Sequence, residues 1–241
     1  MFLKTLMINF IKELPSYLNR KIKTKKTSYS LTSIDLVIDF IFKKKNGVYI
    51  DVGCNHPVYN NNTYLLSKKG WRGINIDIDK KSIELFNIFR KKDLNINLAV
   101  SSEETELEYI NYHEKSPINK IKTFENNTNE KFENIKKIKS STLNSIIENS
   151  EYRDKSIDFV SIDVEGHELN VIKGFNLKKY KPSIVVIEFL DTSLKKIEIK
   201  NFKLQNVIES EIYKLMIKNE YHMVNWFHSD LIFAHNSFKS G

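Results

Sequence analysis

The chain has 241 residues with a formal net charge of +8, and 41% of its residues are hydrophobic. This length fits one domain with a sizeable core. The single cysteine, Cys54, excludes an internal disulfide and suits a reducing, cytoplasmic compartment. No apolar stretch approaches the roughly 20 residues that a membrane-spanning helix needs.

The basic charge does not indicate a nucleic-acid partner. The lysines are scattered apart from clusters at Lys43–Lys45 and Arg20–Lys26, and no recognition helix or aromatic RNA-binding motif accompanies them. We therefore expect a solvated surface, with attraction for an anionic glycan or nucleotide sugar as a secondary effect.

Residues 1–30 are predicted to form an N-terminal segment ahead of a single domain at 31–241. Met1–Leu14 is apolar with interspersed polar residues, and it lacks the cleavage site of a secretory signal. The pattern predicts an amphipathic helix that ends at Pro15, before the basic run. Such a helix either packs on its own domain or makes a peripheral contact with the inner face of a membrane.

The stretch Gly47–Asn55 has the pattern of a buried parallel strand that ends in a ligand loop. Its apolar run leads into Asp51, Gly53 and Asn55. The glycine lets a ligand approach the backbone, and the two polar side chains offer hydrogen bonds. One glycine falls short of the G-x-G-x-x-G dinucleotide motif, so an ordinary strand-to-helix turn is the alternative. The next residue, His56, either lines the pocket or packs at a turn.

A second strand, Trp71–Asp79, again ends on carboxylates. Asp77 lies 24 residues after Gly53, close to the spacing at which an acid in nucleoside-binding folds accepts hydrogen bonds from ribose hydroxyls. The alternative is that it caps the helix predicted at Ser82–Arg90, a role that suits Asp79 better. The apolar residues expected on one face of that helix are Ile83, Phe86 and Phe89.

Three further strands are predicted at Ile96–Ser101, Ile157–Gly166 and Ser183–Glu188, with a helix at Glu168–Lys173. Strands that alternate with helices indicate a mainly parallel sheet covered on both faces. Ligands bind such sheets outside the carboxyl ends of the strands, where this chain places its acids and amides. Residues 114–139 are polar and nearly aperiodic, which predicts a lid, a binding loop or a disordered loop near that edge.

Five segments carry a resemblance to a known family. They are Ile50–Asn55, Lys69–Asp77, Asn97–Ser101, Ser141–Ile146 and Ile157–Glu168. In order and spacing they resemble the FkbM-type S-adenosylmethionine-dependent methyltransferases, and the D-V-E-G-H-E run that ends the last segment is the most specific part. The resemblance implies an α/β, Rossmann-like class I methyltransferase domain. Its sheet would have seven strands, mainly parallel, with helices on both faces and an antiparallel last strand.

The C-terminal part of the chain agrees with this fold. A helix is expected at Glu209–Asn219, and two strands joined by a short turn are expected at Tyr221–Trp226 and Asp230–His235.

The resemblance also implies S-adenosylmethionine as the methyl donor and assigns residues to it. Asp51, Gly53 and Asn55 would hold its methionine end, Asp77 its ribose, and Val100 its adenine.

Methyl transfer to an oxygen requires in-line alignment and removal of the hydroxyl proton. The candidates for proton acceptor are Asp163, Glu165 and His167. The two acids are two residues apart, so an extended strand end points both to one side, and their repulsion could raise one pKa. His167 titrates near neutral pH without such help. Alternatively, Glu165 and Glu168 cap the following helix, or Asp163 and Glu188 hold a divalent cation that acidifies the acceptor.

The predicted function is therefore O-methylation, and the resemblance points to a sugar hydroxyl on a bacterial polysaccharide, glycolipid or secondary metabolite. Two alternatives from other classes share the βαβ pattern. The missing glycine triplet disfavours a nicotinamide-dependent oxidoreductase. The acid cluster disfavours a non-catalytic module that binds a nucleoside, nucleotide sugar or glycan.

Overall fold

The computed structural model describes residues 26–112, 119–122, 134–189 and 203–239. The helices within these ranges are α2 (Ile34–Phe42), α3 (Tyr64–Lys68), α4 (Lys80–Phe89), α5 (Leu143–Glu148), α6 (Glu168–Lys173), α7 (Leu177–Tyr180), α8 (Leu204–Glu209) and α9 (Glu211–Lys218). The strands are β1 (Val48–Val52), β2 (Arg72–Asp77), β3 (Leu94–Asn97), β4 (Ala99–Val100), β5 (Glu106–Ile110), β6 (Lys120–Ile121), β7 (Ile135–Ser141), β8 (Phe159–Ile162), β9 (Ile184–Glu188), β10 (Tyr221–Phe227) and β11 (Asp230–His235).

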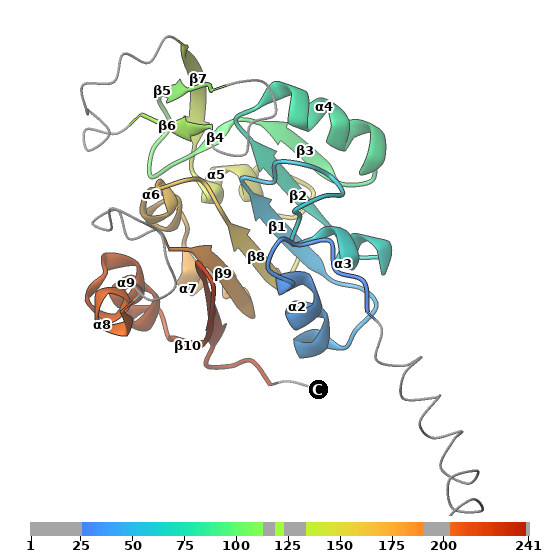
Figure 1. Cartoon of the computed structure of the whole chain (residues 1–241), viewed down its shortest axis with the longest axis vertical. Helices are drawn as coiled ribbons and strands as arrows, with labels where there is room; N and C mark the ends of the chain where they lie inside the picture. Colours follow the sequence, from blue (N-terminus) through green and yellow to red (C-terminus); the bar gives the residue numbers. More distant parts are fainter. Residues whose placement is uncertain (1–25, 113–118, 123–133, 190–202, 240–241) are drawn as a thin grey trace, which may run out of the picture.

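Seven strands form one sheet in the order β3-β2-β1-β8-β9-β11-β10 (Figure 1). β11 runs antiparallel to its neighbours β9 and β10, and the other pairings are parallel. The predicted mainly parallel sheet with an antiparallel last strand is therefore confirmed. The chain order reverses between β1 and β8, and this switch point is where open α/β sheets bind ligands.

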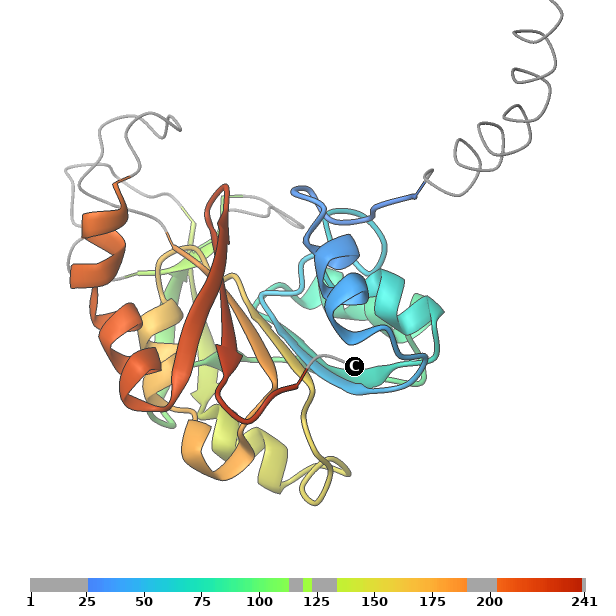
Figure 2. The same cartoon turned by 90° about the horizontal axis from the view of Figure 1, so that it is seen from below.

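Both faces of the sheet are covered by helices, as predicted (Figure 2). Successive strand residues point to opposite faces. Tyr49 and Phe159 therefore pack with α2 and α3 on one face, whereas Ile50 and Val160 pack with α5, α6 and α9 on the other. The parallel strands are buried on both sides, which explains why they are almost continuously apolar.

A second, smaller sheet was not predicted. Its strand order is β4-β7-β5-β6, and it lies at the top of Figure 1. The strand expected at Ile96–Ser101 is therefore wrong in one respect: the chain divides at Leu98, so that β3 completes the large sheet and β4 pairs with β7. The expected loop at 114–139 also contains β6 and β7; residues 113–118 and 123–133 lie outside the described residues.

The predictions for the helices α4 and α9 are confirmed in part. Asp79 caps α4 as predicted, because its side chain accepts hydrogen bonds from the amides of Lys81 and Ser82. Phe89, expected on the buried face of that helix, is 61% exposed. The helix expected at Glu209–Asn219 is present as α9, but it begins at Glu211 because the Ser210 hydroxyl caps it and separates it from α8.

The amphipathic helix and basic run predicted before residue 26 lie outside the described residues, so peripheral membrane contact stays a prediction. Among the described helices, none is both long and apolar enough to cross a membrane. The adjoining residues are tied to the domain. Ser28 Oγ donates to Asp35 Oδ1 at 2.6 Å, and the Tyr29 amide donates to Asp35 Oδ2 at 2.7 Å.

The ends of β1 and β8 meet at Gly53, which has a φ of +79°. A Cβ on this residue would lie 1.6 Å from the main-chain oxygen of Asp163. The glycine is therefore required by the close approach of two strand ends, and not only by the approach of a ligand.

We predict that Gly53→Ala destabilises the protein by about 3–5 kcal/mol, from steric overlap and the left-handed φ together. Gly166→Ala is the matched control, because its φ is +101° but no atom lies within 4 Å of an added Cβ. It should cost only about 1–2 kcal/mol. Urea unfolding measures both, and equal losses would contradict the role of the Asp163 carbonyl.

Candidate active site

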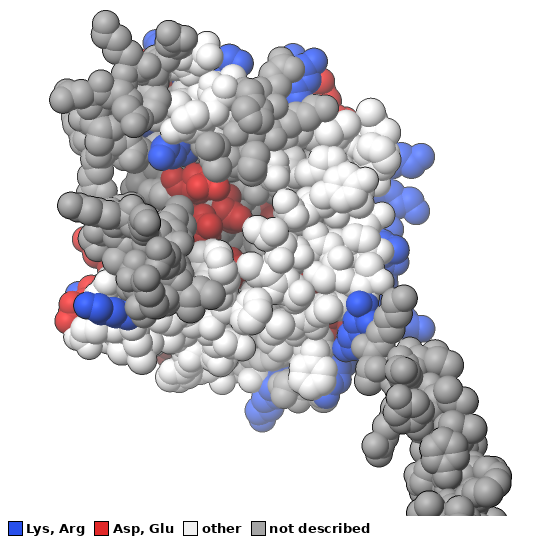
Figure 3. Space-filling view, viewed as in Figure 1, with Lys and Arg blue, Asp and Glu red and all other residues white. Residues whose placement is uncertain are grey.

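A cavity of about 340 Å³ opens at the carboxyl edge of the large sheet, a size typical of small-molecule sites. Its walls come from the ends of β1, β2, β8 and β9, from residues 30–32, from β4 and β6, and from the turn between β10 and β11. Figure 3 shows acidic side chains gathered in this hollow. The site therefore lies at the edge that the sequence predicts.

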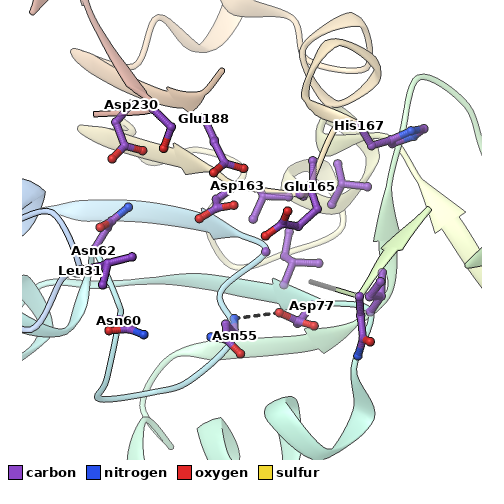
Figure 4. A pocket seen from close by; sticks show the side chains of 18 of the residues that line it. Leu31, Asn55, Asn60, Asn62, Asp77, Asp163, Glu165, His167, Glu188 and Asp230 are labelled. Atoms are coloured by element: carbon purple, nitrogen blue, oxygen red, sulfur yellow. Dashed lines mark hydrogen bonds between the residues drawn. The ribbon is translucent and has the colours of Figure 1, made fainter. Parts of the chain in front are cut away.

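One end of the cavity is formed by the loop after β1 and the end of β2. The amide of Asn55 donates to Asp77 Oδ2 at 2.8 Å, the dashed line in Figure 4. The amide of Asp79 donates to the other oxygen of Asp77 at 2.7 Å. Burial outweighs these hydrogen bonds and raises the pKa of Asp77 to about 6. Gly53, Asn55 and Asp77 all line the cavity, as their predicted donor roles require.

Apolar side chains line the next part of the wall. They are Ile78, Leu98, Ala99, Val100 and Ile121. The predicted adenine contact, Val100, is thus placed beside the cavity by the small sheet. Ile121 is supplied by the segment predicted to lean over this edge.

Asp51 does not line the cavity. It is buried beneath the loop, where Oδ2 accepts hydrogen bonds from Asn61 Nδ2 at 3.0 Å and Thr63 Oγ1 at 2.7 Å. Burial raises its pKa, and these hydrogen bonds oppose the rise. Asp51 therefore stabilises the loop. The predicted direct contact between Asp51 and the donor does not fit this position.

His56 also acts locally. Its Nδ1 accepts hydrogen bonds from the amides of Val58 and Tyr59, and its ring stacks on that of Tyr59. It is not among the residues that line the cavity. Of the two alternatives for His56, the packed turn is the one that the structure supports.

Three carboxyl groups converge in the middle of the cavity. Asp163, Glu165 and Glu188 point toward one another in Figure 4, and each offers an oxygen within 4.8 Å of the other two. They could hold a divalent cation, because Mg²⁺ and Mn²⁺ prefer carboxylate oxygens.

The pKa values of Asp163 and Glu188 are coupled because the two side chains lie close together. Burial raises both pKa values; the hydrogen bond between the two side chains then lowers the pKa of Asp163 and raises that of Glu188. The pKa of Asp163 is raised to about 7 and that of Glu188 lies higher, so Glu188 is the proton donor of the pair and Asp163 the group that loses its proton first. One oxygen of Glu188, Oε2, is buried and accepts no hydrogen bond.

The turn after β8 directs Glu165 into the cavity. Glu165 has a left-handed φ of 57°, followed by Gly166 at 101°. Glu168 closes this turn, because its Oε1 accepts hydrogen bonds from the amides of Val164 and Gly166. Of the two glutamates, Glu168 lies in the first turn of α6, where its charge complements the helix dipole.

His167 is buried, and both of its ring nitrogens have partners. Nε2 lies 3.1 Å from Ser101 Oγ, and Nδ1 lies 3.2 Å from Asn170 Nδ2. Burial lowers its pKa, and Figure 4 shows the ring directed away from the three carboxyl groups. The geometry therefore favours Asp163 or Glu165 over His167 as a proton acceptor in the cavity.

The far end of the cavity contains residues that the sequence analysis did not single out. Asp230 is 7% exposed and accepts a hydrogen bond from Thr32 Oγ1 at 2.9 Å. Asn62 accepts from Ser30 Oγ and donates to Ser161 Oγ. The sequence could have indicated Asp230 through the antiparallel last strand. The first residue of such a strand lies at the carboxyl ends of the parallel strands, and Asp230 indeed pairs with Glu188.

A family model for the methyltransferase FkbM domain matches residues 51–223, more than half of the chain. The chain belongs to the FkbM methyltransferase family. It is thus a methyltransferase that uses S-adenosylmethionine, in agreement with its class I strand order. Family membership sets aside the oxidoreductase and the non-catalytic binding module. Comparison with curated protein sequences finds no match.

Solved structures similar to this chain include three methyltransferases. One is a TehB-like SAM-dependent methyltransferase from Corynebacterium glutamicum, with 9% identity, a TM-score of 0.43, and coverage of 95% of this chain and 99% of that one. Another is an O-methyltransferase from Bacillus cereus in complex with SAH, with 11% identity, a TM-score of 0.45, and coverage of 92% and 88%. The small RNA methyltransferase HEN1 has 11% identity and a TM-score of 0.41 over 90% of this chain and 28% of its own. At TM-scores below 0.5, these likenesses add nothing to what the strand order and the family show.

Proposed function

We propose that this methyltransferase acts on a hydroxyl oxygen of a sugar-like acceptor, carried by a bacterial glycan, a glycolipid or a secondary metabolite. The observation that carries the proposal is the group of three carboxyl side chains, Asp163, Glu165 and Glu188, in the same cavity as the donor loop. A hydroxyl group is a weak acid, so its methylation needs a group that accepts the proton.

The donor-facing residues fit S-adenosylmethionine, which supplies a methyl group made electrophilic by a positive sulfur. Asp77 presents a half-buried carboxylate for ribose hydroxyls, and Val100 belongs to an apolar wall suited to adenine. Gly53 and Asn55 adjoin the space for the methionine end. The nearby carboxylates complement a positive charge.

Asp163 is the residue proposed to accept the acceptor proton. Burial raises the pKa of Asp163 to about 7, which makes it a stronger base than an ordinary aspartate, and the hydrogen bond from Glu188 limits this rise. Glu165 lies beside it on the same turn and can receive or relay the proton.

A divalent cation held by Asp163, Glu165 and Glu188 is the second candidate mechanism. The spacing of their oxygens, within 4.8 Å, favours it. Such a cation would lower the pKa of a bound hydroxyl group. Glu188 would have to be ionised to bind the cation, whereas it stays protonated in the first mechanism. The two mechanisms therefore differ in the protonation state of Glu188.

The far end of the cavity supports an uncharged, polyhydroxylated acceptor. Its wall carries the hydroxyl, amide and carboxyl groups of Ser30, Thr32, Asn60, Asn62 and Asp230, beside Leu31 and His228. Within the described ranges, no lysine or arginine lines the cavity, although Lys120 lies close enough to Glu165 to lower its pKa. Such a wall offers hydrogen bonds to sugar hydroxyls and repels phosphate or carboxylate groups.

We predict that S-adenosylhomocysteine binds through ionised Asp77. Affinity should fall roughly tenfold per pH unit below about pH 6, where Asp77 takes up a proton and loses its acceptor oxygens. Asp77→Asn should weaken binding at pH 7.5 by about 1–3 kcal/mol and flatten this pH dependence. Calorimetry from pH 5 to 8 measures both. An unchanged affinity in the variant would remove Asp77 from the donor site.

We further predict that Asp163→Asn slows methyl transfer by on the order of 10²–10⁴-fold with little change in S-adenosylhomocysteine affinity. Glu188→Gln is the matched control: glutamine imitates the protonated glutamate and should keep most activity. The assay uses S-adenosylmethionine with a labelled methyl group and surface glycans from a strain that lacks the gene.

If a cation is required instead, EDTA should abolish activity, Mn²⁺ or Mg²⁺ should restore it, and Glu188→Gln should be as damaging as Asp163→Asn. Full turnover by Asp163→Asn without metal dependence would exclude both mechanisms.

For the acceptor end, Thr32→Val and Asp230→Asn should raise the acceptor KM about tenfold, on the scale of one lost hydrogen bond. S-adenosylhomocysteine affinity should not change. Thr105→Val, at an exposed threonine, is the control. A raised donor Kd with an unchanged acceptor KM would place these residues on the wrong side of the cavity.

A further inference from the structure

Arg90 lies outside the cavity but beneath the loop that forms part of it. It follows α4 and is 3% exposed. Its Nε donates to Asp93 Oδ2 at 2.9 Å, and the side chains of this ion pair are each 1% exposed. A charge buried this deeply is costly unless its remaining donors are satisfied.

The remaining donors of Arg90 all point at one loop and its support. Nη1 lies 3.4 Å from the carbonyl oxygen of Pro57 and 3.4 Å from Asn61 Oδ1. Nη2 donates to Thr63 Oγ1 at 3.2 Å and to the hydroxyl of Tyr49 on β1. One planar guanidinium group thus contacts the loop between Cys54 and Thr63 at Pro57 and at its end, as well as Tyr49 on the strand beneath it.

The hydrogen-bond partners of Arg90 in turn bond to residues next to the cavity. Asn61 Nδ2 donates to the carbonyl oxygen of Cys54 at 3.1 Å, immediately before Asn55. Asn61 and Thr63 also donate to Asp51 Oδ2, at the end of β1. Arg90 therefore bonds directly to the end of the loop, at Asn61 and Thr63, and reaches its start at Cys54 through Asn61.

The same loop serves both ends of the cavity. Asn55 lies at the donor end, and Asn60 and Asn62 lie with Asp230 away from His167 (Figure 4). Asn55 and Asn60 have left-handed φ values of 50° and 46°. Residues other than glycine adopt this conformation at a cost, so the loop needs external contacts to keep its shape.

We propose that Arg90 is a positioning residue that holds this loop in the shape needed for donor binding. The inference rests on the proposed donor site at Gly53, Asn55 and Asp77. Arginine is required because only its fork of donors reaches Asp93, Tyr49 and the loop at once; lysine keeps the charge but supplies one point of contact.

The test compares S-adenosylhomocysteine binding by calorimetry in three variants. Arg90→Lys should raise the Kd about 10–100-fold, the effect of misplacing groups that contact a ligand. Thr63→Val keeps Arg90 but removes one of its two links to Asp51, the other being Asn61, and it should also raise the Kd. Arg72→Lys is the matched control, because the Arg72 guanidinium contacts only the carbonyls of Ser67 and Trp71 in the described structure. It should bind like wild type.

Hydrogen exchange of the ligand-free protein separates positioning from general stability. In Arg90→Lys, exchange should increase at the amides of residues 53–63 while β8 and β9 stay as protected as in wild type. A uniform increase over the whole domain, or wild-type affinity in Arg90→Lys, would overturn the proposal.

The donor site itself is controlled separately. If wild-type protein binds S-adenosylhomocysteine and Asp77→Asn weakens that binding, a failure of Arg90→Lys to do so counts against Arg90 alone. If wild type shows no binding, the proposed donor site fails, and the exchange pattern at residues 53–63 still decides whether Arg90 holds the loop.

Discussion

The close contact between Gly53 and the main-chain oxygen of Asp163 is the constraint on which the rest of the site depends. It joins the ends of β1 and β8 at the point where the strand order reverses. The loop after β1 carries the groups proposed to bind the donor, and the turn after β8 carries the carboxyl groups. Because no side chain fits between them, the distance between the two sets is fixed by backbone packing and does not rely on a flexible contact.

Buried charged groups occur in two places, below the loop after β1 and in the cavity. Below the loop, Arg90 is paired with Asp93 and satisfied by neighbouring oxygens. In the cavity, no lysine or arginine of the described residues lines the wall, and burial raises the pKa values of both Asp163 and Glu188. The first arrangement gives a rigid support. The second leaves a basic oxygen where a hydroxyl acceptor can reach it, which is what methyl transfer to oxygen requires.

Much of this arrangement could be predicted from the sequence, because parallel strands leave strong apolar runs that end in polar residues. That pattern located Asp77 and Asp163 at one edge of the sheet. It could not show that Asp51 turns under the loop or that Arg90 holds it, because those contacts join residues far apart in the chain. The small sheet was missed for a related reason: its strands are short or rich in lysine, and pairing with β5 and β4 gives β7 its conformation.

A crystal structure of the protein with S-adenosylhomocysteine tests the central claim most directly. The account predicts that the ribose hydroxyls contact Asp77, that the adenine lies against Val100, and that the sulfur faces the side of the cavity where Asp163 and Glu188 meet. A ligand bound with its sulfur turned away from these carboxyl groups, or bound outside the cavity, would contradict the proposed use of this edge of the sheet.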